Sequence, residues 1–227
     1  MILEKIFKFI DKNYHHPRIN KFLLNYKIET VIDVGSHKGE FLENLVKFVN
    51  FKKAYTFEPQ KKIFKILVEK FKDKEKFIHN NLAVSDIVGS KSIKISKLTS
   101  TSTLSNENKN SNYLKFKKLI VNDKNENNQS YNVDTITLDS FFKEKKLNNC
   151  LLKIDVEGHE LNVLNGSKNA IKKIKYIILE RQYFNSYADS FPKECDKFLI
   201  NNSFKLIKKF RFPTLQAEDR FYINKEY

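Results

Sequence analysis

The stretch TVIDVGSHKGE, residues 30–40, decides the fold of this chain. Its apolar run from Thr30 to Val34 has the length of a buried strand, and a turn that contains Gly35 and Gly39 follows directly. Glycine permits backbone conformations and close approaches that other residues exclude, and the first N–H groups of a following helix are available to a ligand. A strand, a glycine turn and a helix in this order predict a nucleotide-binding unit.

The spacing in this turn is D-x-G-x-x-x-G, whereas a dinucleotide fold has G-x-G-x-x-G and places a pyrophosphate on the helix N-terminus. S-adenosylmethionine has no pyrophosphate. It carries an amino-acid tail and a sulfonium group, so an acidic residue at the strand end and a looser turn suit it better. The candidate cofactor-binding residues here are Asp33, Gly35, Ser36, His37 and Gly39. The alternative interpretation is a tight connection of the kind found in any α/β domain.

A second strand, Lys53–Glu58, ends in a carboxylate. Glu58 lies about 20 residues after Gly39, the offset at which an acidic side chain binds ribose hydroxyls in nucleotide-binding βαβ units. We therefore predict that Glu58 binds the ribose of the cofactor. Pro59 fits the first turn of the next helix, which we expect to span Gln60–Phe71.

The run LLKIDVEGHELNVLNG, residues 151–166, closely resembles the core motif of FkbM-type methyltransferases, a class I family that depends on S-adenosylmethionine. Shorter motifs agree in order: Asp33–Gly35, Phe57–Pro59, Asn81–Asp86, Ser102–Leu104 and Thr137–Phe141. The resemblance covers roughly residues 30–182. It implies O-methylation, commonly of a hydroxyl on a sugar, polysaccharide, glycolipid or natural product. It also adds Pro59, Asn81, Leu82 and Ala83 to the candidate cofactor-binding residues.

Strands and helices alternate along the chain, which predicts a doubly wound, mostly parallel sheet. In the class I order the sheet has seven strands, the last two forming an antiparallel hairpin at its edge. The strands are expected at Thr30–Val34, Lys53–Glu58, Phe77–Val84, Leu151–Val156, Lys173–Leu179, Phe204–Phe210 and Arg220–Ile223. Short strands are expected at Ser90–Ser96 and Tyr131–Ile136, and a short helix at Asp139–Lys146 with Asp139 as its N-cap.

The length of 227 residues fits one α/β domain, which we expect at residues 29–227 behind a helical cap at residues 1–28. Residues at about 99–130 are rich in Ser, Thr, Asn, Lys and Glu and form a polar insertion. Such an insertion is either a surface loop or a lid over the acceptor site. The motif Ser102–Leu104 favours a site-facing position for its beginning.

Carboxylates gather where the strands 151–156 and 173–179 end. Asp155 and Glu157 are alternate residues and should project to the same side, and Glu180 should join them at the ligand-binding end of the sheet. Crowded carboxylates raise one another's pKa, so one of them can serve as a base. Equally, Asp155, Glu157 and Glu180 can bind Mg²⁺ through oxygen ligands.

His159 follows the same strand and titrates near neutral pH. We predict that it acts as general base or orients the acceptor, together with Asp155 and Glu157. The alternative is a helix N-terminal residue in contact with solvent.

The formal charge of +15 raises the question of a nucleic-acid partner. The arginines are only Arg18, Arg181, Arg211 and Arg220, and the lysines are scattered along every segment. Nucleic-acid recognition favours the planar guanidinium group, so we expect a solvated lysine surface that attracts an anionic acceptor such as a nucleotide-sugar. An RNA methyltransferase is the alternative function, and a binding module without turnover is a third.

The two cysteines, Cys150 and Cys195, have no ligand spacing, which fits a reducing compartment and a cytoplasmic location. Charged residues interrupt the N-terminal segment Met1–Asn13, so it is not a signal peptide or a membrane span. Its apolar residues follow helical periodicity. We expect a helix that either caps the domain or rests on the inner face of a membrane.

Overall fold

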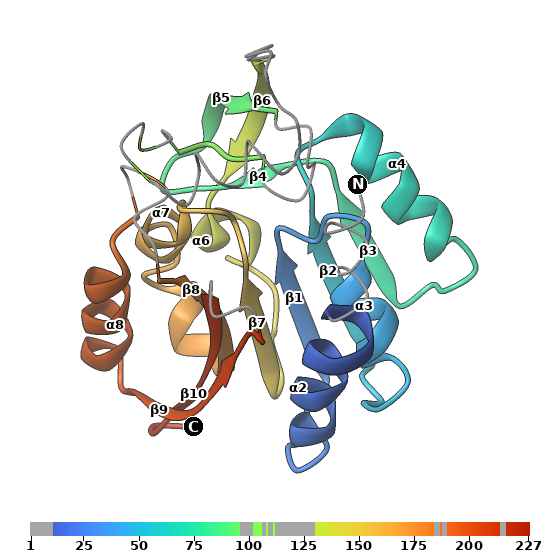
Figure 1. Ribbon diagram of the computed structural model, residues 1–227, viewed down its shortest axis with the longest axis vertical. Helices are drawn as coiled ribbons and strands as arrows, with labels where there is room; N and C mark the ends of the chain where they lie inside the picture. Colours follow the sequence, from blue (N-terminus) through green and yellow to red (C-terminus); the bar gives the residue numbers. More distant parts are fainter. Residues whose placement is uncertain are drawn as a thin grey trace.

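The structure is a computed structural model that describes residues 11–95, 102–105, 108, 111, 130–183, 187, 190–213 and 217–227. A seven-stranded sheet forms its centre, in the order β3-β2-β1-β7-β8-β10-β9 (Figure 1). In that order the strands span Phe77–Asn80, Lys53–Phe57, Thr30–Val34, Cys150–Ile154, Ile174–Gln182, Ala217–Asn224 and Phe204–Arg211. Neighbours from β3 to β8 pair in parallel, and β10 runs antiparallel to β8 and β9. The predicted doubly wound sheet with an antiparallel edge hairpin is confirmed.

Helices cover both faces of this sheet (Figure 1). One layer holds α2 (His16–Leu23), α3 (Glu40–Leu45) and α4 (Lys61–Lys70). The other holds α6 (Leu138–Phe141), α7 (Glu160–Asn165), the 3-10 helix η3 (Ala170–Lys173) and α8 (Pro192–Asn201). Because successive residues of a strand point to opposite faces, Val31 packs with the first layer and Ile32 with the second. Every residue of β1 and β7 is buried, as expected for central parallel strands.

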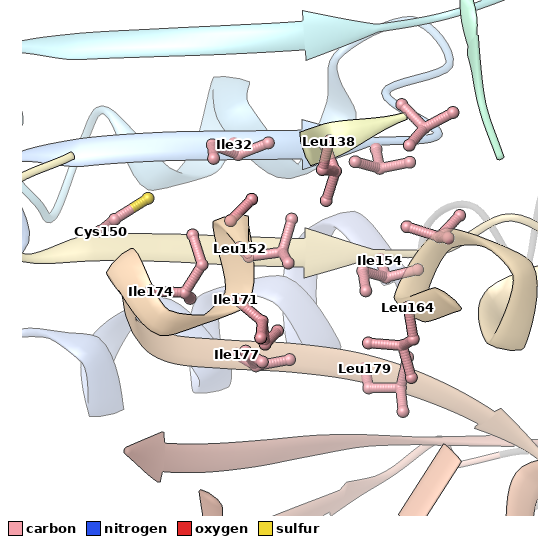
Figure 2. Close-up of a cluster of buried hydrophobic side chains, with 14 of the residues drawn as sticks. Ile32, Leu138, Cys150, Leu152, Ile154, Leu164, Ile171, Ile174, Ile177 and Leu179 are labelled. Carbon is pink, nitrogen blue, oxygen red and sulfur yellow. The ribbon is translucent and has the colours of Figure 1, made fainter. Parts of the chain in front are cut away.

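The core beneath the second layer is apolar throughout. Figure 2 shows Ile32, Leu152 and Ile177 on neighbouring strands, with Leu164 of α7 and Ile171 of η3 in the same cluster. All five side chains have no exposed surface. Burying each such side chain stabilises the fold by about 1.5–3 kcal/mol, so this cluster fixes the position of β7, the strand that carries the predicted catalytic loop.

The predicted strand Phe77–Val84 is wrong in its extent, because the chain breaks there into two strands. Residues Phe77–Asn80 form β3 of the large sheet, and β4 (Ala83–Val84) belongs to a second sheet of order β4-β6-β5. Its other strands are β5 (Gly89–Lys94) and β6 (Ser130–Ile136). The side chain of Asn81 lies at the break and donates to the carbonyl oxygens of Glu58 (2.8 Å) and Pro59 (3.1 Å). These bonds draw the chain away from β2, and the small sheet lies above the carboxyl ends of the central strands (Figure 1).

Two further boundaries differ from the prediction. The N-cap of α6 is Thr137, whose hydroxyl accepts from the Ser140 N–H, and not Asp139. The Asp139 carboxylate instead accepts from the N–H groups of Asn169 and Ala170 at the start of η3. Strand β8 continues through Glu180 to Gln182, because its pairing with β10 extends that far.

The N-terminal elements bind the edge hairpin of β9 and β10. A π-helix, η1, spans Asp11–His15 and leads into α2. The buried His15 places its Nε2 2.8 Å from the Asp219 Oδ2 of β10, and the Arg18 side chain donates to the Arg211 carbonyl at 2.8 Å. The predicted helix Met1–Asn13 falls mostly outside the described residues. Within the part of the chain that the structure describes, no helix has both the length and the apolar character to cross a bilayer.

Candidate active site

A pocket lies at the carboxyl ends of β1, β2 and β7, and it has about 530 Å³ of space including its open mouth. The lining residues are Val34, Gly35, His37, Phe57, Glu58, Pro59, Gln60, Leu82, Ala83, Val84, Ile93, Ser102, Thr103, Leu104, Asp155, Val156, Glu157 and His159. This lining combines apolar groups with carboxylates and histidines, which suits a ligand that is part aromatic and part polar.

The glycine turn is tied to the end of β2. The N–H groups of Gly35 and Ser36 donate to the Phe57 carbonyl at 3.1 and 3.0 Å, and the Ser36 hydroxyl donates to the Asp33 carbonyl at 2.8 Å. Gly35 has φ +82°, and a Cβ there would lie 1.9 Å from the Asp155 carbonyl oxygen. The missing side chain therefore lets the loops after β1 and β7 touch, so the close approach at Gly35 is to the protein backbone.

Four of the predicted cofactor-binding residues do not line the pocket, namely Asp33, which is described below, and three residues that hold other parts of the protein in place. Ser36 holds the turn, and Asn81 holds the loop of Glu58 and Pro59. Gly39, with φ +74°, begins α3, and a Cβ there would meet the Phe71 ring at 2.5 Å, so this glycine lets α3 pack against α4.

Glu58 is 3% exposed and lines the pocket. Its Oε2 accepts from the His37 N–H at 3.0 Å, and its Oε1 accepts from the Gln60 N–H at 2.8 Å. Burial raises the pKa of Glu58, and these backbone hydrogen bonds oppose that rise. The Gln60 side chain also hydrogen-bonds to Glu58, and because a carboxylate has about four acceptor positions, this carboxylate keeps capacity for a ligand hydroxyl.

Asp33 lies behind the pocket and does not line it. It is 1% exposed, and within the described residues neither carboxylate oxygen has a hydrogen-bond partner. Burial raises its pKa to about 6, although the nearby Lys153 opposes the rise. Lys153 stands opposite Asp33 in the sheet and donates to Asp155 Oδ2 at 2.8 Å. Burial alone lowers the pKa of a lysine, but Asp155, Asp33 and Asp219 keep the pKa of Lys153 above its ordinary value.

Asp155 and Glu157 both line the pocket, but not as alternate residues of an extended strand. Strand β7 ends at Ile154, and Glu157 has φ +53°. The Glu157 carboxylate accepts from Gln182 Nε2 at 2.6 Å and from the Tyr187 hydroxyl at 2.8 Å. Asp155 and Glu157 therefore lie at one rim, as predicted. They do so because the chain turns after β7, which the alternation of strand residues did not indicate.

Glu180 does not join the rim of this pocket. It lies within β8 and lines a smaller cavity with Glu160, Cys195 and others. Burial, and then Asp155 and Glu157, raise its pKa well above the ordinary value. The neighbouring Glu160 accepts from the Gly158 N–H at 3.0 Å, and burial raises its pKa to about 7.

The predicted magnesium ligands are not assembled as a metal site. In the described ranges no group of three or more His, Cys, Asp or Glu side chains is arranged to hold a metal ion. The physical reason is that the carboxylates have other partners, since Asp155 binds Lys153 and Glu157 binds Gln182 and Tyr187.

His159 is only 4% exposed, so the alternative of a solvent-exposed residue is wrong. It lines the pocket, and its Nε2 lies 2.9 Å from the hydroxyl oxygen of Ser85. The sequence interpretation had no role for Ser85; its place in the motif Asn81–Asp86 was the only available signal. Ser102–Leu104 line the pocket as predicted, and the Thr103 hydroxyl donates to the Glu157 carbonyl at 2.6 Å.

Residues 33–206 match the protein family described as "Methyltransferase FkbM domain". Among solved structures the chain is similar to the methyltransferase FkbM from Methylobacillus flagellatus KT, with 15% identity and a TM-score of 0.55. That match covers 87% of this chain and 44% of the other, so the chain spans less than half the length of the Methylobacillus protein. No curated protein matches the chain.

Two further structures were solved with the cofactor or its product. TrmK of M. capricolum, in complex with S-adenosylhomocysteine, has 13% identity and a TM-score of 0.53, and the match covers 94% of this chain and 68% of that one. Sp1610 of Streptococcus pneumoniae, a candidate tRNA (m1A22) methyltransferase in complex with S-adenosylmethionine, has 11% identity and a TM-score of 0.52, with coverages of 91% and 72%. Identities this low show a shared fold alone.

The strand order and the pocket at the carboxyl ends of the parallel strands match the fold of class I methyltransferases. The chain belongs to the FkbM methyltransferase domain family, whose match covers most of its length.

The pocket fits S-adenosylmethionine, the cofactor bound in the structure of Sp1610. The remaining acceptor position of Glu58 would accept from a ribose hydroxyl, and Phe57, Leu82 and Ile93 provide apolar surface for the adenine. The carboxylates of Asp155 and Glu157 would favour the positive sulfonium.

Proposed function

We propose that the chain methylates a hydroxyl group of a sugar, presented as a nucleotide-sugar or as a unit of a surface polysaccharide. The observation that carries the proposal is that Asp155, Glu157 and His159 belong to one loop of the cofactor pocket. Carboxylate and imidazole groups accept hydrogen bonds from hydroxyls, and a sugar offers several hydroxyls at once. Clustered carboxylates at the reaction centre also disfavour the close approach of an RNA backbone, because like charges repel.

The surface beside the pocket supports an acceptor with a negative group at some distance from the reacting hydroxyl. Lys61, Lys62 and Lys65 are exposed on the first turns of α4, directly after the pocket residues Pro59 and Gln60. Their positive charges would attract the diphosphate of a nucleotide-sugar.

The bound cofactor supplies a methyl group on a sulfonium leaving group. The residues of this chain have to align the acceptor oxygen and remove its proton. Alignment contributes on the order of 7–11 kcal/mol in well-oriented reactions, and a base adds about 10²–10⁴-fold in rate. Asp155 and Glu157 would orient the sugar through its hydroxyls, and His159 would accept the proton.

The test is methyl transfer from isotope-labelled S-adenosylmethionine to two pools, one of nucleotide-sugars and glycans and one of total RNA. We expect label in the sugar pool, a strong loss of turnover in Asp155→Asn with nearly unchanged affinity for S-adenosylhomocysteine, and no change in the surface control Asp73→Asn. Label in RNA alone, with binding that weakens steeply as salt rises, would overturn the proposal.

A further inference from the structure

His159 is connected to the small sheet by a chain of hydrogen bonds. Its Nε2 lies 2.9 Å from the Ser85 hydroxyl oxygen, and Ser85 donates to Asp86 Oδ1 at 2.8 Å. The Lys91 ammonium donates to the same Asp86 oxygen, also at 2.8 Å. Ser85 and Asp86 follow β4, Lys91 lies in β5, and His159 is the N-cap of α7, so the chain joins two separate parts of the fold.

Ser85 is held firmly at the centre of this chain. It has no exposed surface, and its N–H donates to the Ile136 carbonyl at 2.9 Å. The end of α7 packs against it, since a Cβ on Gly166 would lie 2.1 Å from the Ser85 carbonyl oxygen. The hydroxyl therefore has a fixed position relative to the imidazole.

The positions of the protons follow from the charge of Asp86. Burial alone would raise its pKa, but the hydrogen bonds from Lys91 and Ser85 outweigh burial and hold the pKa below its ordinary value. An ionised carboxylate only accepts hydrogen bonds, so the single hydroxyl proton of Ser85 points to Asp86. The Ser85 oxygen then accepts from His159, and neutral His159 carries its proton on Nε2. Its basic lone pair is on Nδ1.

We propose that Ser85 and Asp86 are positioning residues that fix His159 as the Nε2–H tautomer and so make Nδ1 the atom that accepts the proton of the sugar hydroxyl. This inference rests on the proposed function. In the reaction the hydroxyl oxygen forms a bond to the methyl carbon, the carbon–sulfur bond breaks with its electron pair going to sulfur, and the hydroxyl proton passes to Nδ1. The resulting imidazolium is stabilised through Ser85 by the Asp86 charge.

The test is ¹⁵N NMR of the imidazole rings at a pH where the histidines are neutral, with the His159 signals assigned from His159→Gln. We expect a protonated Nε2 and an unprotonated Nδ1 for His159. In Ser85→Ala the preference should be lost, and kcat should fall at least tenfold with little change in the affinity for S-adenosylhomocysteine. Asp86→Ala should act in the same direction, and the 35% exposure of the Asp86 side chain makes loss of folding unexpected.

The chain offers a matched control in Thr56 and His79. The Thr56 hydroxyl lies 2.8 Å from His79 Nδ1, and neither residue lines the pocket. Thr56→Val should change the His79 signals and leave kcat unchanged. A protonated Nδ1 on His159 in the unmodified protein, or an unchanged His159 tautomer or kcat in folded Ser85→Ala, would overturn the inference. Label in RNA alone, with the tautomer and the Ser85→Ala effect intact, would overturn the sugar acceptor and leave the positioning role standing.

Discussion

Gly35 shows how one residue joins the cofactor half of the site to the catalytic half. A Cβ at this position would lie 1.9 Å from the Asp155 carbonyl oxygen, so only the hydrogen atom of glycine fits between the two loops. The sequence pattern correctly required a glycine here. It did not reveal that the neighbour is the loop after β7, because residues 120 positions apart in the chain meet only once the strands are paired.

We expect Gly35→Ala to weaken binding of S-adenosylhomocysteine at least tenfold, because the added methyl group forces the two loops apart and the φ of +82° is strained for alanine. Calorimetric titration measures the loss. Gly89→Ala is the control, since it also has an unfavourable φ, +154°, but open space around its Cβ. Equal binding by the two variants would show that the contact with Asp155 does not matter.

His16 gives the fold a dependence on pH. Burial, and then the charge of Lys153, lower its pKa to about 4, from 6.5 in the unfolded chain. The unfolded state therefore binds more protons between these two values, and the stability that neutral His16 provides is present above pH 6.5 and lost as the pH falls towards 4.

The loss should amount to at most about 3 kcal/mol of the free energy of unfolding. Urea unfolding of the unmodified protein and of His16→Gln at pH 7 and at pH 4.5 measures it. The variant should lose less stability on acidification, because its side chain does not titrate. Identical losses would assign the acid sensitivity to other groups.

At the scale of elements, periodicity and motif order predicted the central strands and both layers of helices, because apolar strands of five or six residues between amphipathic helices have few other arrangements. The small sheet was not predicted. Residues 77–84 were predicted to form one strand, and the bonds of Asn81 to two carbonyl groups on another segment divide them. Glu157 was misjudged for the same reason, since its turn depends on Gln182 and Tyr187.

Asn81 lies in the connection between β3 and β4 and holds the loop that carries Glu58. In Asn81→Ala both hydrogen bonds to that loop are lost. The carbonyl groups of Glu58 and Pro59 lose a donor, so we expect the affinity for S-adenosylhomocysteine to fall about tenfold, which corresponds to roughly 1.4 kcal/mol. Asn25→Ala removes a similar side-chain bond, to the Phe22 carbonyl, at an exposed position and should leave affinity unchanged. Unchanged affinity in Asn81→Ala would mean that Glu58 is positioned by His37 and Gln60 alone.

At the scale of the whole molecule, the core beneath α7 and η3 determines stability. Leu152 has no exposed surface, and Leu152→Ala should lower the free energy of unfolding by about 2–5 kcal/mol, because it creates a cavity under the catalytic loop. Denaturant unfolding measures the change. Leu24→Ala, at a side chain that is 57% exposed, should change it by less than about 0.5 kcal/mol. Similar values for the two variants would contradict this description of the core.

The position of β10 bears on how the chain folds as it is synthesised. This strand follows all the other described strands in the chain, yet it lies between β8 and β9 and holds the Asp219 that binds His15. Until residues 217–224 emerge, β8 presents an unpaired edge, and His15 lacks the carboxylate against which it is buried. Unpaired apolar edges in nascent chains promote aggregation. Synthesis of this protein therefore includes a period, ending once β10 has emerged, in which a chaperone would have a surface to protect.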